Sequence, residues 1–555
     1  MLAPLLGSIG CAHSGPVVAS TAPAAEEISV QEIGGGEERT HPVTMATGER
    51  VRITIVPPAA GMWLRVYAPD SAWVAERFTP DSTPPAPLEI LAEAAGVHRI
   101  VVESMPTAPP SPYEIRVNRL TVQENARETA ALDSATAWLR RSAHPLATVQ
   151  PGDSYADPAP LKTILSAVRV VGIGESTHGT REFHQLGARL AQFLVQEMGY
   201  TVFAVETSEI AAHAINEYVL RGIGDRAAVL AGQGTWNFDT EDFSSLLDWM
   251  REYNRTAPAA RRVRFAGFDM QYNPGSRDTI VAYLRRVAPD RVPATDSVLA
   301  VLTEAPDPAR PDFVRYYTLQ PEAKRPILQA ISELHSYLES NREQLAALSS
   351  ATQASTIARR VKLLVQFADA HSRPGFDQSD STSGVATRDR HMAENVLHAL
   401  EADPATKIVL YTHAEHARRD PYRMGYYLSA ALRDSYYALG IGFHRGGFQA
   451  LRIGGGNPPR LEAFTFPVPF QYSVGWYMNR AGIGDLFVDF RGVPTQGAVA
   501  EWLSRPLAMR SVGNGYAPGN PSGYYRAPVV LGRSFDGIAF VEETTRARSN
   551  PTVRR

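Results

Sequence analysis

A strand, loop, helix and strand pattern at residues 168–206 most constrains what this chain can fold into. Its sequence is VRVVGIGESTHGTREFHQLGARLAQFLVQEMGYTVFAVE. The first six residues are an apolar run rich in β-branched side chains, which is typical of a strand buried in a parallel sheet. After the loop, apolar residues recur at three- and four-residue spacing and predict an amphipathic helix that ends near Gly199. Residues 201–205 then predict a second buried strand.

Ionisable side chains follow these strands. A right-handed crossover places both strands in one parallel sheet, so the residues after each strand reach the same edge. Two more apolar runs, at residues 264–268 and 407–411, predict further strands of this sheet. The side chains that come at or just after the ends of the four strands are Glu175 and His178, Glu206, Asp269, and His413 with His416. We therefore expect one polar crevice rather than four separate helix caps.

The residue types in this crevice indicate hydrolysis. A neutral histidine such as His178 can accept a proton from water, and the neighbouring Glu175 can fix its tautomer and stabilise the imidazolium. Further histidines can donate hydrogen bonds to a developing oxyanion or protonate a leaving oxygen. Glu206 can orient the base or the water. This set suffices for cleavage of an ester or lactone without a cofactor and without a covalent intermediate.

Other chemistries use the same residues. His413, His416 and Glu206, together with His178, could supply nitrogen and oxygen ligands to a catalytic zinc or manganese ion. Gly-Glu-Ser-Thr-His almost matches the nucleophile elbow G-x-S-x-G, but a histidine replaces the last glycine, which argues against Ser176 as a nucleophile. The same loop lacks the third glycine of a dinucleotide-binding fingerprint. A non-catalytic ligand-binding lipoprotein is the alternative from another functional class.

The chain is too long for one core and predicts more than one domain. Residues 1–26 resemble a signal or tether, and residues 27–122 show short alternating runs separated by Gly and Pro, which predict a small antiparallel β-sandwich. This part is similar to the pre-peptidase C-terminal type of domain and indicates an accessory role. Residues 123–555 predict an α/β domain with a mostly parallel central sheet flanked by helices. A helical insertion at about residues 278–370 is expected to act as a lid or as a structural layer.

Composition limits the partners. The formal net charge of −3 on 555 residues gives no case for nucleic acid or an anionic membrane. Cys11 is the only cysteine, so the chain can form neither an internal disulfide nor a thiolate metal site. The apolar stretch before Cys11 resembles the end of a bacterial lipoprotein signal, which would export the protein to the periplasm or anchor it through lipid; a fortuitously apolar N-terminus is the other interpretation.

Seven motifs together resemble the erythromycin esterase family. They are GESTHGTREF, the VET strand end at Glu206, WNFDTEDFSSLLDWMREYN, FAGFD, RDRHMAENV, HAEH and a closing SFDG, in the order and spacing of that family over about residues 130–545. The resemblance implies an α/β core with a helical insertion. It also implies metal-independent attack of water on an ester, with macrolide antibiotics as the substrates of the members that confer resistance.

Carried over to this sequence, the resemblance makes His178 the general base, Glu175 its partner and Glu206 a second acid, with His413 and His416 as the later histidines. Asp269, Arg181 and Arg388 lie at or within these motifs and are expected to contact the small-molecule substrate. One departure concerns recognition. Macrolide-cleaving members carry an arginine nine residues after the base, where this chain has Gly187; Arg189 lies two positions further on.

Overall fold

The computed structural model describes residues 26–56, 61–79, 87–152, 154–306, 313–375, 379–401, 403–454, 459–518 and 521–551. Cys11 and the predicted tether lie outside these residues. The chain divides into two compact units, Met1–Ala130 and Ala131–Arg555. No helix in the described part of the chain is long and apolar enough to cross a membrane.

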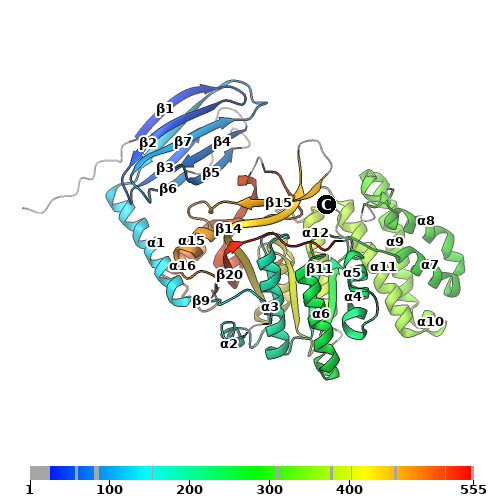
Figure 1. Ribbon diagram of the computed structural model, residues 1–555. Coiled ribbons are helices and arrows are strands. Elements are labelled where there is room, and N and C mark those ends of the chain that lie inside the picture. The colour runs from blue at the N-terminus through cyan, green and yellow to red at the C-terminus, as the bar shows by residue number, and fades with distance from the viewer. Residues whose placement is uncertain are drawn as a thin grey trace, which may run out of the picture. The chain divides into compact units, whose positions relative to one another are not determined.

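The first unit is a sandwich of two antiparallel sheets (Figure 1). One sheet has the order β1 (Glu26–Ile33), β8 (Ser111–Arg119), β3 (Arg50–Val56) and β6 (Leu88–Leu91). The other has the order β2 (Glu38–Met45), β7 (Gly96–Ser104), β4 (Met62–Tyr67) and β5 (Trp73–Thr79). Alternate side chains of both sheets share one apolar core, which includes Ile53, Leu64, Ile100 and Ile115. The predicted β-sandwich is therefore present.

Helix α1 (Val122–Ser142) crosses the division between the units, which lies between Ala130 and Ala131. Its start is a capping box: the hydroxyl of Thr121 accepts from the backbone N–H of Glu124, and the Glu124 carboxylate accepts from the N–H of Thr121. Arg50 donates to the side chains of Asn125 and Thr129. These bonds hold the first turns of the helix to the β-sandwich.

The second unit is built on a mixed, mostly parallel sheet. Its order is β12 (Arg264–Asp269), β11 (Val202–Ser208), β13 (Ile408–His413), β10 (Val170–Glu175), β14 (Tyr436–Arg452), β20 (Gly537–Thr544), β16 (Leu486–Asp489) and β9 (His144–Pro145). The strands from β12 to β20 are parallel, and β16 and β9 pair antiparallel at the other edge. β15 (Arg460–Phe466) and β18 (Gly515–Tyr516) pair with β14, and β17 (Pro506–Arg510) pairs with β19 (Tyr525–Val530). The predicted α/β fold is confirmed.

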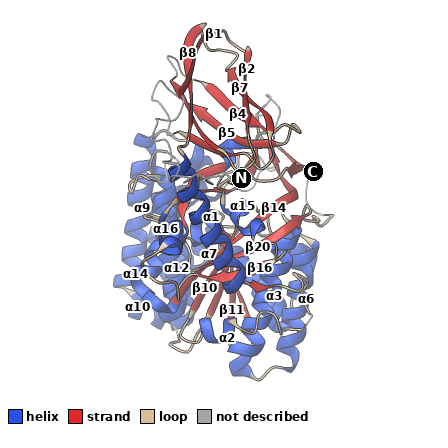
Figure 2. Cartoon of the chain, turned by 90° about the vertical axis from the view of Figure 1, so that its left-hand side faces the viewer, coloured by secondary structure: helices blue, strands red, loops and turns tan. Residues whose placement is uncertain are grey.

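Helices cover both faces of this sheet. Figure 2 shows α3 (Arg181–Met198) and α6 (Glu241–Thr256) on one side, and α12 (Gly384–Glu401) and α14 (Met424–Leu432) on the other. The remaining helices near the sheet are α2 (Leu161–Ile164), α4 (Glu209–Arg221), α5 (Arg226–Ala231), α13 (Ala414–Ala417), α15 (Val474–Arg480), α16 (Ala498–Ser504) and α17 (Leu531–Ser534). Short 3₁₀ turns are η1 (Ala259–Arg261), η4 (Arg433–Ser435) and η5 (Pro521–Tyr524).

The predicted helical insertion lies between β12 and α12. It comprises α7 (Ser276–Val287), η2 (Pro289–Arg291), α8 (Val292–Thr303), η3 (Arg315–Thr318), α9 (Pro321–Ser340), α10 (Arg342–Ala347) and α11 (Ala351–Ser372). Figure 1 shows α7 to α11 gathered in one group of helices in green.

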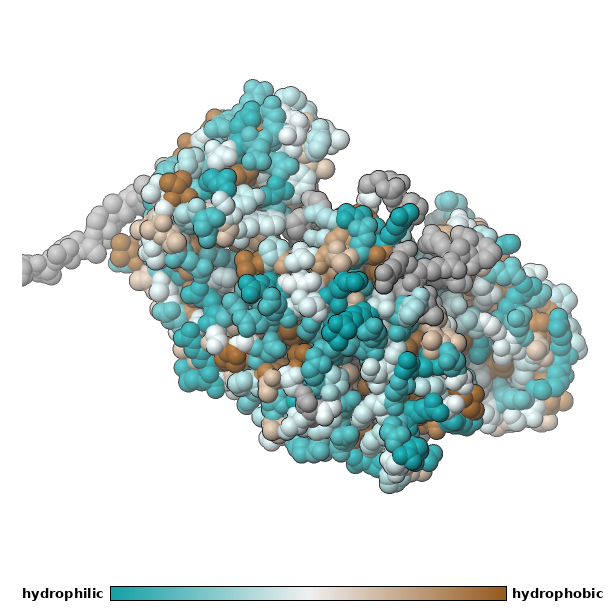
Figure 3. All heavy atoms as spheres, viewed as in Figure 1, coloured by the Kyte–Doolittle hydropathy of each residue, from teal (hydrophilic) through white to brown (hydrophobic). Residues whose placement is uncertain are grey.

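The face of the molecule in Figure 3 is mostly hydrophilic, and its apolar side chains are scattered rather than gathered.

Candidate functional site

Glu175 and His178 form the central pair of the site. Glu175 is the last residue of β10, and its Oε1 lies 2.7 Å from Nδ1 of His178. The hydroxyl of Tyr411, on the neighbouring strand β13, donates to the other oxygen, Oε2, at 2.6 Å. Because Nδ1–H of His178 is the donor that fits the carboxylate, its Nε2 carries the lone pair. The sheet therefore fixes both the orientation and the tautomer of a histidine that can act as a base.

His413 lies beside this pair because β10 and β13 are parallel and in register, with Glu175 opposite His413. The ring centroids of His178 and His413 are 5.0 Å apart. Nδ1 of His413 accepts from the backbone N–H of Glu415 at 3.3 Å, which places the hydrogen of a neutral ring on Nε2. Of these two adjacent rings, His178 therefore offers a lone pair on Nε2 and His413 offers an N–H donor on Nε2.

Glu206 reaches the site through a β-bulge. The register of β11 against β12 shifts between Val205 and Ser208, so that two residues of β11 stand opposite one residue of β12. A bulge turns side chains away from the regular alternation of the strand. A Cβ at Gly267 of β12 would lie 2.4 Å from the carbonyl oxygen of Thr207, so the backbone needs a glycine there. The carboxylate of Glu206 accepts from Thr412 Oγ1 at 2.8 Å and from the backbone N–H of His413 at 3.0 Å.

Arg388 of α12 joins three of the predicted residues. Its guanidinium lies 2.8 Å from Glu206 Oε1 and 2.6 Å from Asp269 Oδ2. It also lies 3.2 Å from Nε2 of His416, whose Nδ1 is 2.7 Å from the carboxylate of Asp389. Asp269, Glu206 and His416, which the strand-end argument placed at one edge, are therefore brought together, and Arg388 of α12 joins them.

Charge in this cluster is fixed by mutual pairing. Burial opposes the charged form of His416, but the carboxylates of Asp389 and Glu206 raise its pKa to about 10. Burial likewise opposes ionisation of Glu206, yet His416 and Arg388 hold its pKa well below the ordinary value. Near neutral pH the cluster therefore contains an imidazolium, a guanidinium and ionised carboxylates.

The donor set proposed for a metal ion is used within the protein. Arg388 occupies the space between the carboxylates of Glu206 and Asp269 and the Nε2 of His416. Nδ1 of His416 is held by Asp389. Among the described residues, no group of three or more His, Cys, Asp or Glu side chains is arranged to hold a metal ion. The guanidinium of Arg388 therefore already stands between Glu206 and His416.

A cavity of about 890 Å³ opens over this edge of the sheet. Its floor is formed by the cluster just described, namely His178, Glu206, Asp269, Arg388, His413 and His416. The helical insertion supplies one wall through Phe313, Tyr317, Lys324 and His371. A second wall is the loop at residues 233–237, between α5 and α6. Pockets of this size accept drug-sized molecules.

Two residues weighed from the sequence lie away from the cavity. Arg181 is at the start of α3 and approaches Asp242 of α6 at 3.6 Å, and it does not line the cavity. The turn into α3 directs its side chain away from the strand ends. Ser176 is fully buried, and its carbonyl accepts from the N–H of Val512. Neither residue lines the cavity.

Sequence reasoning missed two residues that position the histidines. Tyr411 and Asp389 hold Glu175 and His416, respectively. Tyr411 is an ordinary strand residue in the sequence, and only pairing of β13 with β10 reveals its partner. Asp389 belongs to the RDRH part of a motif quoted from the sequence. An acid between two arginines and next to a histidine could have identified it as a candidate pairing residue.

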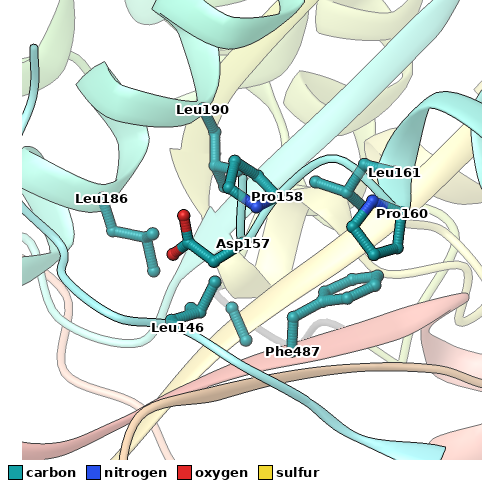
Figure 4. Close-up of a pocket in the computed structure, with 9 residues that line it drawn as sticks. Leu146, Asp157, Pro158, Pro160, Leu161, Leu186, Leu190 and Phe487 are labelled. Atoms are coloured by element: carbon teal, nitrogen blue, oxygen red, sulfur yellow. The ribbon is translucent and has the colours of Figure 1, made fainter. Parts of the chain in front are cut away.

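Gly187 and Arg189 have structural explanations. A Cβ at Gly187 would lie 2.2 Å from the ring of Tyr411, so no side chain fits there unless Tyr411 moves. Arg189 is buried at 1% exposure and pairs with Asp157 at 2.5 Å. Figure 4 shows Asp157 among Leu186, Leu190 and neighbouring apolar side chains. Arg189 therefore belongs to the protein interior and does not replace the missing arginine of macrolide-cleaving members.

Comparison with known proteins decides the family. The family model described as erythromycin esterase matches residues 195–544, which is more than half of the chain. The chain belongs to the erythromycin esterase family. Together with hydrolase-named relatives, this membership makes it an ester hydrolase.

Two relatives match about three quarters of this chain. Erythromycin esterase type II of Escherichia coli is 24% identical over 453 residues, covering 74% of this chain and 97% of the relative. The putative hydrolase YbfO of Bacillus subtilis is 22% identical and covers 74% of this chain and 90% of the relative.

Solved structures show the same fold. A Bacillus cereus protein aligns with a TM-score of 0.64 at 22% identity, covering 76% of this chain and 99% of that chain. The erythromycin esterase EreC, in an open conformation, aligns with a TM-score of 0.59 at 17% identity, covering 74% of this chain and 99% of that chain. At these identities, the similarity between this erythromycin esterase family member and the solved structures shows a shared fold and nothing more.

Proposed function

We propose that this protein cleaves an ester or lactone by direct attack of water, with His178 as the general base. The observation that carries this proposal is the 2.7 Å contact between Glu175 and His178, with the His178 ring lining the cavity. Nε2 of His178 takes a proton from water as the oxygen attacks the carbonyl carbon. Glu175, held by Tyr411, then stabilises the imidazolium that forms.

The neighbouring groups suit the charge that develops on the carbonyl oxygen. Nε2–H of His413 can donate to this oxygen, since its Nδ1 accepts from the backbone. The positive charges of Arg388 and His416 lie next to it across Glu206. His178 returns its proton to the leaving alkoxide, so the products are a carboxylic acid and an alcohol.

Macrolide macrolactones are the substrates we propose first, because two relatives are named for erythromycin. A cavity of about 890 Å³ has room for a large lactone. This chain has Gly187 where macrolide-cleaving members carry an arginine. Arg189 cannot take the place of that arginine because it pairs with Asp157. We therefore expect hydrolysis itself to be retained and macrolide affinity to be the weaker property.

A metal-dependent mechanism on the same scaffold would use His413, His416 and Glu206. The Arg388 guanidinium between Glu206 and His416 disfavours it, because a divalent cation would have to displace a paired arginine. Activity that survives prolonged dialysis against EDTA supports the water mechanism. Activity that falls with EDTA and returns with zinc or manganese would replace it.

The substitution His178→Asn tests the general base. It should lower kcat/KM by roughly 10²–10⁴-fold on any ester that the wild-type protein cleaves, because water loses its proton acceptor. Hydrolysis of a panel of macrolides and simple aryl esters measures this, with His398→Asn on the exposed side of α12 as the matched control. Turnover by His178→Asn close to that of the control would contradict the proposal, and no hydrolysis by the wild type would favour a ligand-binding protein.

A further inference from the structure

One wall of the cavity carries a group of buried polar side chains. Gln233, Asn237 and Thr207 line the cavity and are 2%, 6% and 3% exposed, respectively. Trp236 lines it beside them. Within the described residues, five polar atoms of this group have no hydrogen-bond partner: Gln233 Nε2 and Oε1, Asn237 Oδ1, Thr207 Oγ1 and Trp236 Nε1. We call these four residues the polar wall.

Such a group is costly unless something binds to it. A buried donor or acceptor without a partner costs about 1–3 kcal/mol, and native proteins satisfy nearly all of them. Here the residues that carry the unpartnered atoms all line the same cavity. A bound molecule would satisfy several of them at once.

The loop that carries Gln233, Trp236 and Asn237 is tied down at its C-terminal end, and Thr207 belongs to strand β11. The amide of Asn550, near the C-terminus, donates to Asp239 Oδ1 at 2.7 Å, and its backbone N–H donates to the Asp239 carbonyl at 3.1 Å. Thr240 caps the start of α6 by accepting from the N–H of Phe243. The backbone at the C-terminal end of the loop is therefore fixed before a substrate arrives, which lowers the entropic cost of binding.

The chemistry of the polar wall indicates its ligand. Gln233 and Thr207 can both donate and accept, Trp236 only donates, and Asn237 Oδ1 accepts. This mixture matches hydroxyl groups, which also do both. The charges at the cavity balance once His416 and its partner Asp389 are included: the carboxylates are Glu206, Asp269, Glu415 and Asp389, and the cations are Arg373, Arg388, Lys324 and the His416 imidazolium. Burial, together with Arg388, lowers the pKa of His371 to about 4, so this ring adds no charge.

We propose that the polar wall is a specificity subsite that binds hydroxyl groups on the alcohol part of an uncharged, oxygen-rich ester. This inference rests on the proposed function, because the floor of the same cavity carries out the hydrolysis. The subsite positions the alcohol part, and His178 and His413 act on the carbonyl group. Sugar esters are the substrate class that it selects.

Two esters that differ in hydroxyl groups test the subsite. They are 6-O-butanoylglucose and cyclohexylmethyl butanoate, which share an acyl group and a six-membered ring. The wild-type protein should prefer the glucose ester by at least tenfold in kcat/KM. Gln233→Met and Asn237→Leu should each lower that preference by about tenfold. Gln344→Met, at an exposed glutamine of α10, is the matched control and should keep the preference.

The midpoint of thermal unfolding distinguishes a binding role of Gln233 from a structural role, because the two roles predict changes of opposite sign. Gln233→Met removes an amide without a partner among the described residues, so it should raise the midpoint of thermal unfolding while it reduces the preference. A lower midpoint with an unchanged preference would assign Gln233 to the architecture of the loop and overturn the subsite.

Failure of the subsite and failure of the proposed function give different results. If both esters are cleaved by the wild type and not by His178→Asn, but the preference is absent, the hydrolase stands and the subsite is wrong. Calorimetric binding of 6-O-butanoylglucose to the His178→Asn protein tests the subsite without turnover. Binding that is weakened tenfold by adding Gln233→Met supports the subsite even if no ester is cleaved, and no binding overturns it.

Discussion

At the scale of single residues, the site depends on which partner each ionisable group has. His178 pairs with one carboxylate and faces the cavity, whereas His416 lies between Asp389 and Glu206 and next to Arg388. The first arrangement leaves a nitrogen free to accept a proton. The second holds a permanent positive charge near neutral pH, because the pKa of His416 is raised to about 10 by Asp389 and Glu206 against the effect of burial. Two histidines of the same motif set thus have different tasks.

This charge predicts how stability depends on pH. Because the pKa of His416 is higher in the folded protein than its ordinary value of 6.5, its contribution is complete below about pH 6.5 and is lost as the pH rises toward 10. The midpoint of thermal unfolding of the wild type should therefore exceed that of His416→Gln by more at pH 6 than at pH 9.5. Melting curves of both proteins across this range measure it. A difference that stays constant over the range would mean that His416 is not charged in the folded protein.

At the scale of elements, a bulge and a helix define the site. The irregularity of β11 after Val205 turns Glu206 toward Arg388, and Gly267 leaves room for the bulged backbone. Helix α12 brings Arg388 and Asp389 onto the same edge of the sheet. The insertion then closes one side of the cavity through Phe313 and neighbouring residues. Strand β11, helix α12 and the insertion are far apart in the sequence, and each of them contributes side chains to the site.

The substitution Gly267→Ala tests the bulge. A Cβ at this position meets the carbonyl oxygen of Thr207 at 2.4 Å, so the strand must shift and Glu206 with it. We expect a loss of about 1–3 kcal/mol in the free energy of unfolding, as for other overpacked sites, and at least a tenfold loss of kcat. Gly492→Ala is the control, since its Cβ would have no atom within 4 Å. Unfolding and kinetics equal to the control would show that the bulge is not needed to place Glu206.

At the scale of the whole molecule, the two units have separate cores. The apolar core of the β-sandwich is formed within residues 33–117, and the large core of the second unit lies within residues 146–541. The residues proposed for hydrolysis all belong to the second unit. The first unit contains none of them, which agrees with an accessory role for the β-sandwich.

A chain that begins at Leu120 tests this separation. It keeps Thr121 and Glu124, whose capping box starts α1, and loses the bonds from Arg50 to the first turns of the helix. We expect a folded protein with kcat/KM within about twofold of the full-length chain, since the large core is complete. Circular dichroism and hydrolysis of the same esters measure this. An insoluble product would show that the β-sandwich is an integral part of the fold.

The sequence by itself determined four central strands of the large sheet, the helix after the first of them, and the edge at which the ionisable residues meet. Alternating or continuous apolar runs identify strands locally, and parallel connections are right-handed, so Glu175, Glu206, Asp269 and His413 could be placed together. These features depend on short-range periodicity and on a general rule of chain topology.

Only the tertiary structure decided which charges pair and what each pairing does. The hydroxyl of Tyr411 reaches Glu175 from a strand 236 residues away, and Arg388 reaches Glu206 from a helix 182 residues away. Arg181, which stands close to His178 in the sequence, points elsewhere and pairs with Asp242. Pair energies and pKa values depend on distances of a few ångströms and on burial, and sequence spacing specifies neither for residues on different elements.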